Sequence, residues 1–178
     1  MKLKSTIMDE AAVRRSMARI THEIIEKNKG TDDLLFVGIK RRGVPLAQML
    51  ADNIEHFENV KVPVGSVDIT LYRDDLTELG DIPSTGESSI PWDINGKKII
   101  VVDDVIFTGR TARAAIEALF HFGRPREIQL AVLVDRGHRE MPIRPDYVGK
   151  NIPTARSEIV SVCVDAVDGN TCVDLYQM

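Results

Sequence analysis

The chain has 178 residues, of which 43% are hydrophobic and 28% are charged, an ordinary composition for a globular domain. Its formal net charge of −4 argues against a nucleic-acid-binding protein whose whole surface is basic, but it is compatible with a local basic face. No apolar run approaches the roughly 18 residues of a membrane span, and the N-terminus lacks a signal-peptide core, so we expect a cytoplasmic protein without a membrane segment. Cys163 and Cys172 lie in apolar alternating runs without metal-ligand spacing, and we expect them to be reduced core thiols.

The first half of the chain alternates helical and strand patterns. Residues 9–29 are predicted to form a helix, because Asp9 can cap it and apolar residues recur at helical spacing. The short apolar run 34–39 suits a buried strand, and a second helix follows it with Pro45 near its first turn. The β-branched content of residues 64–72 predicts another strand.

The second half opens with residues 73–95, which are acidic and contain Gly, Pro and Ser; a connection of this length is usually functional, often a lid. The segments after it are predicted as a strand at 98–103, a helix at 109–122, a buried strand at 128–134 and an irregular Arg-, Gly- and Pro-rich stretch at 135–154. The closing runs "EIVSVCV" and "TCVDLY" flank the turn residues 168–170 and suggest a strand pair. Together these elements predict a single α/β domain over residues 1–178, with a mostly parallel sheet flanked by helices and a small irregular subdomain.

Two neighbouring carboxylates, Asp103 and Asp104, stand where the apolar run 98–103 ends, and ligands of open α/β sheets bind at such strand ends. The unpaired backbone N–H groups of the following helix start favour a phosphate; they belong to Thr108, Gly109, Arg110 and Thr111. The carboxylates suit neighbouring hydroxyls or a magnesium ion. A sugar phosphate meets both demands. The alternative, two acids that end a strand beside a plain turn, stays open from these residues alone.

The stretch "IIVVDDVIFTGRT" (99–111) resembles the phosphoribosyl-pyrophosphate signature of type I phosphoribosyltransferases. The blocks "DITLYRDDL", "GRPREIQLAVLVDRGHRE" and "DYVGKNIPT" extend the resemblance over nearly the whole chain, to the PyrR family of bifunctional pyrimidine-operon regulators. This resemblance implies a type I phosphoribosyltransferase fold that converts uracil and 5-phosphoribosyl diphosphate (PRPP) to UMP and diphosphate with Mg²⁺. It also implies a transcriptional attenuation regulator that binds pyrimidine-operon leader mRNA, responds to UMP or UTP, and forms a homo-oligomer, a dimer or larger.

Several residues acquire expected roles. The cations and the glycine after the first buried strand suit a pyrophosphate; they are Lys40, Arg41, Arg42 and Gly43. In similar enzymes this loop often holds a non-proline cis peptide bond. By resemblance, residues 73–95 form the flexible catalytic loop with Arg73 as a pyrophosphate contact, and residues 135–157 form a hood in which Arg136 and Gly137 read the base. Asp103 and Asp104 would stabilise the cationic sugar and hold magnesium through water.

The outer face of the first predicted helix carries a basic stripe, for which a solvated face is the ordinary explanation. The resemblance implies that this stripe and the hood together bind RNA, and the residues carried over are Arg15, Arg19, His22, Arg139, Arg144 and Lys150. Two other functions stay open on the residues alone. One is a purine phosphoribosyltransferase without RNA binding, because the 99–111 signature does not choose the base. The other is a non-catalytic nucleotide sensor that kept the fold.

Overall fold

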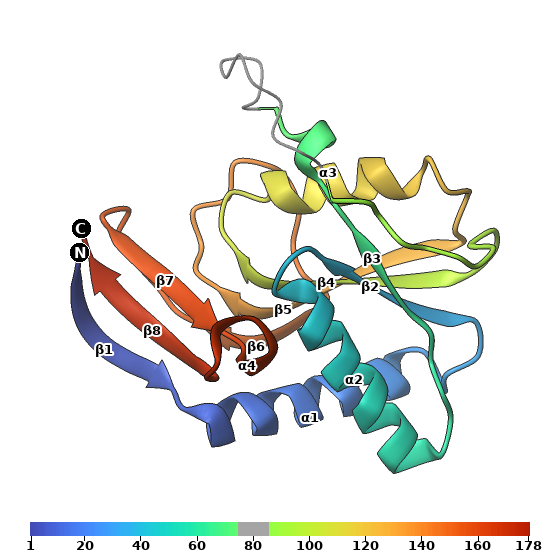
Figure 1. Ribbon diagram of the computed structural model, residues 1–178, viewed down its shortest axis with the longest axis horizontal. Helices are drawn as coiled ribbons and strands as arrows, with labels where there is room; N and C mark the ends of the chain where they lie inside the picture. Colours follow the sequence, from blue (N-terminus) through green and yellow to red (C-terminus); the bar gives the residue numbers. More distant parts are fainter. Residues whose placement is uncertain (75–85) are drawn as a thin grey trace.

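A computed structural model describes residues 1–74 and 86–178. Its centre is a five-stranded parallel sheet with the strand order β3-β2-β4-β5-β6. These strands are β2 (Leu34–Ile39), β3 (Val64–Val67), β4 (Lys98–Ile106), β5 (Glu127–Asp135) and β6 (Tyr147–Asn151). The predicted α/β architecture is therefore confirmed (Figure 1).

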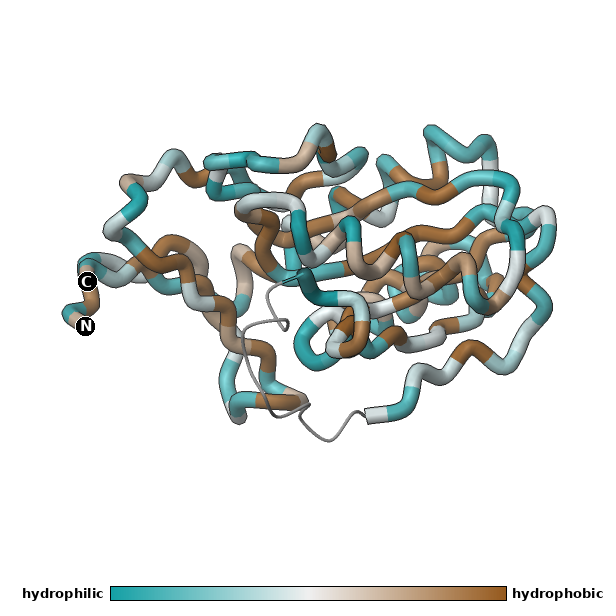
Figure 2. The backbone as a smooth tube through the Cα atoms, turned by 90° about the horizontal axis from the view of Figure 1, so that it is seen from above, coloured by the Kyte–Doolittle hydropathy of each residue, from teal (hydrophilic) through white to brown (hydrophobic). Residues whose placement is uncertain are grey.

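Helices cover both faces of this sheet. The helices α1 (Glu10–Lys27) and α2 (Gly43–Glu58) pack together on one face, and α3 (Arg110–Leu119) packs on the other (Figure 1). Asp9 caps α1 as predicted, because its side chain accepts a hydrogen bond from the N–H of Ala12 at 2.8 Å. The hydrophobic stretches run through the interior and the hydrophilic ones follow the outer turns (Figure 2).

A second, antiparallel sheet has the strand order β1-β8-β7 and joins the two ends of the chain (Figure 1). It consists of β1 (Lys2–Met8), β7 (Glu158–Cys163) and β8 (Cys172–Gln177), with the short helix α4 (Asp165–Asp168) between the last two. The predicted pairing of the two closing runs is confirmed. The sequence reading missed β1, whose alternation is weak because six of its seven residues are not buried.

Three predicted boundaries were wrong. The strand predicted at 64–72 ends at Val67, because Asp68 accepts hydrogen bonds from Thr70 and a 3-10 turn, η1 (Thr70–Tyr72), follows. The helix predicted at 109–122 is shorter, and the strand predicted at 98–103 is longer. The irregular stretch 135–154 contains β6, which pairs with β5.

Within the segment predicted as a flexible loop, residues 73–74 and 86–95 are described, and the longer of these stretches packs on the fold. Ser89 pairs through its backbone with Ser66, and Ile90 and Ile94 are buried against the sheet. This part of the segment is therefore packed. The remainder of the predicted catalytic loop, residues 75–85, lies outside the described residues. Among the described residues, no helix combines the length and apolar composition that a membrane-spanning helix requires.

Candidate active site

Asp103 and Asp104 lie in the last part of β4, beyond the point at which β2 stops pairing with it. The β2–β4 ladder ends at Gly38 and Val102, whereas the ladder between β4 and β5 continues to Ile106. The sequence placed the end of this strand at Asp103, but pairing with β5 carries it past both acids. Within the described part of the chain, no strand therefore pairs with the β2 side of β4 at the two carboxylates, on the edge of the sheet where parallel strands end.

The two carboxyl groups interact with each other. Asp103 Oδ1 accepts a hydrogen bond from the N–H of Asp104 at 2.9 Å, and Asp104 Oδ1 accepts one from the N–H of Val105 at 2.9 Å. Burial, then the charge of Asp104 and a hydrogen bond with it, raises the pKa of Asp103 well above its ordinary value. Two carboxyl groups placed in this way do not readily ionise together. The pair is suited to a partner that brings positive charge or hydroxyl donors.

This donor set fits a magnesium ion that arrives with a phosphorylated substrate. Magnesium is usually bound by one or two carboxylates together with substrate phosphates and waters. In the described parts of the chain, no group of three or more His, Cys, Asp or Glu side chains is placed to hold a metal without such help.

The predicted phosphate loop lies between β4 and α3. A cavity of about 120 Å³ is lined by Asp103, Thr108, Gly109 and Thr111 among others, so one of the acids and the loop face the same space. Thr108 Oγ1 accepts a hydrogen bond from the N–H of Arg110, the first residue of α3, at 3.3 Å. The backbone N–H groups at this helix start are thus placed to bind an anion beside Asp103.

Gly109 is required by both conformation and space. Its φ angle is +90°, and a Cβ atom there would lie 3.2 Å from Met141 Cβ and 3.4 Å from Arg139 Cδ. The carbonyl of Thr108 accepts hydrogen bonds from the N–H groups of Glu140 and Met141 at 2.8 and 2.9 Å. The hood therefore packs directly on the phosphate loop, a contact that the sequence did not reveal.

Arg73 follows η1 and precedes Asp74, at the start of the predicted catalytic loop. Asp74 is paired with Arg110, whose Nε also donates to Glu140 at 2.9 Å. The beginning of the loop is consequently tied to the first residue of α3. The Arg110 side chain is bound to these acids through Nε and Nη1, while its backbone N–H lies at the predicted phosphate loop.

The predicted pyrophosphate loop joins β2 to α2. The peptide bond between Lys40 and Arg41 is cis, as the resemblance implies. The Lys40 ammonium donates to the carbonyl of Glu87, and Arg41 is exposed. Gly43 is buried, and a Cβ atom there would lie 2.3 Å from the carbonyl oxygen of Val102. The absence of a side chain at Gly43 lets the loop approach β4 next to the carboxylates.

Arg42 is held by a carboxylate from the other sheet. Its Nε and Nη2 donate to Asp168 Oδ2 and Oδ1 at 3.0 and 2.8 Å. The hydrogen bond with Asp168 raises the pKa of Arg42, and the charges of Asp168 and Asp104 act in the same direction. Arg42 therefore lies in the field of Asp104 while its guanidinium is bound to α4.

Arg136, predicted to read the base, has its side chain bound to residues of the hood and of β7. Its side chain is buried and donates to the carbonyls of Glu158 at 2.7 Å and Ala155 at 3.3 Å, and to Thr154 Oγ1 at 3.2 Å. Burial lowers its pKa. The sequence pointed to an arginine facing the ligand, but the structure uses these N–H groups to connect the hood to the antiparallel sheet. Gly137, with a φ of +80° and open space around its Cα, stays accessible.

Phe107 is a site residue that the sequence reasoning missed. Its ring is partly exposed, stacks under the guanidinium of Arg136 at 4.0 Å, and meets the His138 ring edge-on at 5.7 Å. An aromatic residue between two acids and a phosphate loop could have been recognised as a stacking surface for a base. No role was predicted for it from the sequence.

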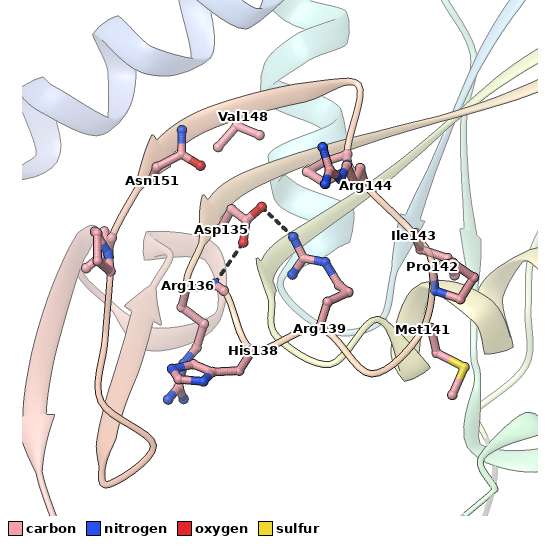
Figure 3. A pocket seen from close by; sticks show the side chains of 14 residues that line it. Asp135, Arg136, His138, Arg139, Met141, Pro142, Ile143, Arg144, Val148 and Asn151 are labelled. Atoms are coloured by element: carbon pink, nitrogen blue, oxygen red, sulfur yellow. Dashed lines mark hydrogen bonds and ion pairs between the residues drawn. The ribbon is translucent and has the colours of Figure 1, made fainter.

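The hood encloses a larger hollow of about 960 Å³, lined by Arg139, Arg144, Val148 and Asn151 among others. In Figure 3 the Arg139 side chain points toward Asp135, to which it donates a hydrogen bond of 2.6 Å. The Arg136 side chain extends away from Asp135 and lies beside His138. Arg139 also donates to the carbonyl of Phe107 at 2.8 Å. Of the two predicted RNA-binding arginines here, Arg139 is thus fixed and Arg144 is exposed.

A second hollow, of about 380 Å³, lies between α1 and β6 and is lined by Arg15, Arg19 and Lys150 among others. Arg19 donates to the carbonyls of Val148 and Gly149 at 3.2 and 2.6 Å. Val148 also lines the hood hollow, so the two hollows adjoin across β6. Three of the six predicted RNA-binding residues, Arg15, Arg19 and Lys150, therefore line one hollow, whereas Arg139 and Arg144 belong to the hood.

His22, on the same helix, contacts α2 rather than β6. Its ring stacks on Phe57 of α2, with centroids 4.4 Å apart and planes inclined by 15°. Phe57 is itself 38% exposed. The α1 surface thus carries aromatic rings toward α2 and cationic side chains toward β6.

The phosphoribosyl transferase domain model matches residues 5–166 of the chain. The chain is 60% identical over 177 residues to the "Bifunctional protein PyrR" of Clostridium perfringens, covering 99% of both proteins. It is 58% identical to the protein of the same name from Thermus thermophilus, covering 99% of this chain and 98% of the other. Among solved structures it resembles a hypoxanthine-guanine phosphoribosyltransferase from Bacillus anthracis, with a TM-score of 0.74, 18% identity and complete coverage of both chains. A hypoxanthine phosphoribosyltransferase of Trypanosoma cruzi gives a TM-score of 0.76 at 21% identity, covering 99% of this chain and 92% of the other.

Proposed function

Because the chain belongs to the phosphoribosyl transferase family and, within it, to the PyrR proteins, we propose that it converts uracil and PRPP to UMP and diphosphate and also binds pyrimidine-operon leader RNA as an attenuation regulator. The observation that carries the catalytic part is the shared cavity of Asp103 and the phosphate loop. This cavity supports the proposal, because a carboxylate can accept hydrogen bonds from a ribose diol and the backbone N–H groups of the loop can donate to a 5′-phosphate.

The charges of the site give each residue a role in the transfer. The 5′-phosphate binds the N–H groups of residues 108–111, and the ribose hydroxyls bind Asp103 and Asp104. Lys40, Arg41 and Arg42, with Arg73 from the adjoining loop, neutralise the departing pyrophosphate. A bound Mg²⁺ would supply further neutralisation of the phosphates. The carboxylates stabilise the oxocarbenium-like sugar that forms, and uracil N1 attacks it, so the chain needs no nucleophile of its own.

The base is proposed to lie against Phe107, with backbone groups near Gly137 reading its edge. The Arg136 guanidinium stacks on the Phe107 ring and is itself bound by a carbonyl of β7, so it holds the ring in place. Uracil is favoured over a purine because the relatives near 60% identity are PyrR proteins, whereas the hypoxanthine enzymes share only the fold.

An assay of pyrophosphate release tests the transferase function. The protein is incubated with PRPP and Mg²⁺, and uracil, hypoxanthine, guanine and orotate are offered separately. We expect pyrophosphate to be released with uracil and with none of the other three bases. Release with hypoxanthine or guanine would identify a purine enzyme instead, and tight UMP binding without any release would identify a nucleotide sensor.

The RNA-binding function is supported by the adjoining hollows at β6, where Arg15, Arg19, Arg144 and Lys150 gather on an otherwise acidic protein. A nucleotide that prefers the RNA-competent state raises RNA affinity by the same factor by which RNA raises nucleotide affinity. UMP or UTP is therefore expected to tighten binding to a leader hairpin in a gel-shift titration. An affinity that does not change over the titration would contradict this link.

We also propose a cytoplasmic homo-oligomer. The exposed rings of Phe120 and Phe122 after α3 offer an apolar surface for contact between copies. Light scattering during size-exclusion chromatography would give the number of subunits, and a monomer at all concentrations would refute the proposal.

A further inference from the structure

The end of the β7–β8 hairpin reaches back to the predicted pyrophosphate loop. Asp168 is the last residue of α4, and it binds Arg42, 126 positions earlier in the chain, through two hydrogen bonds of 3.0 and 2.8 Å. Arg42 immediately precedes α2 and follows the cis peptide bond of the loop. The contact therefore joins the antiparallel sheet to the edge of the parallel sheet that holds the carboxylates.

This ion pair is more shielded from solvent than a fully exposed surface pair. Only 18% of the Asp168 side chain is exposed, against 38% of the Arg42 side chain. Asp168 Oδ2 also accepts a hydrogen bond from the N–H of Val164 at 2.8 Å, which fixes the carboxylate within its own turn. The hydrogen bond with Arg42, followed by that with Val164, lowers the pKa of Asp168, so the pair is ionised near neutrality.

The guanidinium has donors to spare. An arginine carries five N–H groups in a planar fork, and Asp168 takes one from Nε and one from Nη2. The other three, two on Nη1 and one on Nη2, lie in the same plane and are not used by this carboxylate. A long side chain that would otherwise sample many rotamers is thus fixed beside Asp104, whose charge acts on it.

We propose that Asp168 is a positioning residue for pyrophosphate binding, which acts by holding Arg42 so that its remaining N–H groups face the pyrophosphate of PRPP. The inference rests on the proposed transferase function. It assigns to the C-terminal hairpin a part in the active site, although the hairpin itself contributes no phosphate-binding group.

The test uses Asp168→Asn in the full chain. An asparagine oxygen in place of Oδ2 keeps the hydrogen bonds from Val164 and from Arg42 Nε, while its NH₂ group opposes Arg42 Nη2. The matched control is Asp174→Asn on β8, which removes a carboxylate of the same sheet that binds Thr6 instead. Thermal melting of both variants shows that they are folded.

The Michaelis constant for PRPP is expected to rise about five- to tenfold in Asp168→Asn, the scale of one charge-assisted hydrogen bond in a partly exposed site, with that for uracil unchanged. The same substitution in an Arg42→Ala background should add no further loss, because Asp168 acts through Arg42. Asp174→Asn should match the wild type. An unchanged or lower Michaelis constant for PRPP in Asp168→Asn would overturn the inference. So would a rise in this constant that is as large when Asp168→Asn is added to Arg42→Ala as when it is added to the wild type.

Direct calorimetric titration with PRPP and Mg²⁺ separates this inference from the proposed function. If the wild type releases no pyrophosphate with uracil, the transferase proposal fails. The positioning role is still decided by PRPP affinity, which should fall in Asp168→Asn and not in Asp174→Asn. Equal affinity in all three proteins would refute it.

Discussion

Replacing Gly43 with alanine should lower the activity much more than the stability of the fold, because the change disturbs the geometry of the pyrophosphate loop. The added Cβ would lie 2.3 Å from the carbonyl oxygen of Val102 and 3.4 Å from the Cα of Asp103. Both neighbours are backbone atoms of β4, so no side-chain rotation relieves the overlap. Either the loop or the strand segment that carries the carboxylates must move.

The size of the movement follows from the distances. An ordinary contact begins at 3.4 Å, so the 2.3 Å approach requires a displacement of about 1 Å. Overpacking of this kind costs about 1–3 kcal/mol, which for a domain of this length lowers the melting temperature by roughly 2–12 °C. A displacement of about 1 Å between groups that act on one substrate lowers the rate about 100-fold. We therefore expect a large loss of kcat/KM for PRPP with a moderate loss of stability.

The control is Gly96→Ala, because Gly96 has a φ of +70° and nothing within 4 Å of its added Cβ. That change costs about 1–2 kcal/mol of backbone strain far from the loop, so it should lower the melting temperature and leave the activity unchanged. Pyrophosphate release is measured for both variants well below their melting temperatures. If Gly43→Ala stays within about threefold of Gly96→Ala in kcat/KM, the close approach of the loop to β4 has no catalytic importance.

Three further substitutions test other parts of the molecule. Asp104→Asn should lower UMP synthesis at least about 100-fold in the pyrophosphate-release assay, since it removes charge that stabilises the sugar cation, and gel shifts should show RNA binding retained; full activity would contradict its role. Arg19→Ala should weaken leader-RNA binding about five- to tenfold in gel shifts while sparing UMP synthesis. The control is Arg14→Ala on the same helix, where Arg14 pairs with Glu10. Equal effects of the two substitutions would show that RNA binding depends on the total positive charge and not on the position of Arg19. The hydrogen bond from Lys4 lowers the pKa of Glu158. The ionised Glu158 carboxylate therefore stabilises the fold above its ordinary pKa of 4.5, and this stabilisation is lost as the pH falls through the lowered pKa. Thermal melts from pH 6 to pH 3 should therefore fall less steeply for Glu158→Gln than for the wild type, and parallel curves would refute this.

The sequence predicted a candidate site from residues that are local along the chain, and the structure shows that these residues lie close together. Asp103, Asp104 and Gly109 lie within seven residues, and a strand followed by a helix start determines what such a stretch can bind. The pairing of the chain ends was only half visible, because β1 exposes most of its side chains and shows no clear alternation. Its partner β8 could be predicted, since its buried and exposed residues alternate.

The roles of individual cations were not visible, because they depend on partners distant in sequence. Arg136 resembled a ligand-reading arginine, yet its partners are backbone carbonyls 19 and 22 residues away. Arg42 is bound by a residue 126 positions away, and Arg19 by carbonyls about 130 positions away. Residue type and spacing show that a cation is present, but only the fold decides which of its donors are already in use.

These pairings explain how an acidic chain can present sites for anions. Among the described residues, Arg42, Arg110 and Arg139 are each held by a carboxylate at the edge of the sheet where the substrate is proposed to bind. A carboxylate that holds a guanidinium in a fixed orientation cancels part of the positive charge of that arginine. It also reduces the side-chain entropy that is lost when a phosphate binds the remaining N–H groups. Binding of PRPP would then depend less on excess positive charge than on orientation, and partly buried pairs are screened by salt less than exposed ones. The net charge of −4 therefore limits nonspecific attraction of polyanions without weakening the sites that are built from oriented donors.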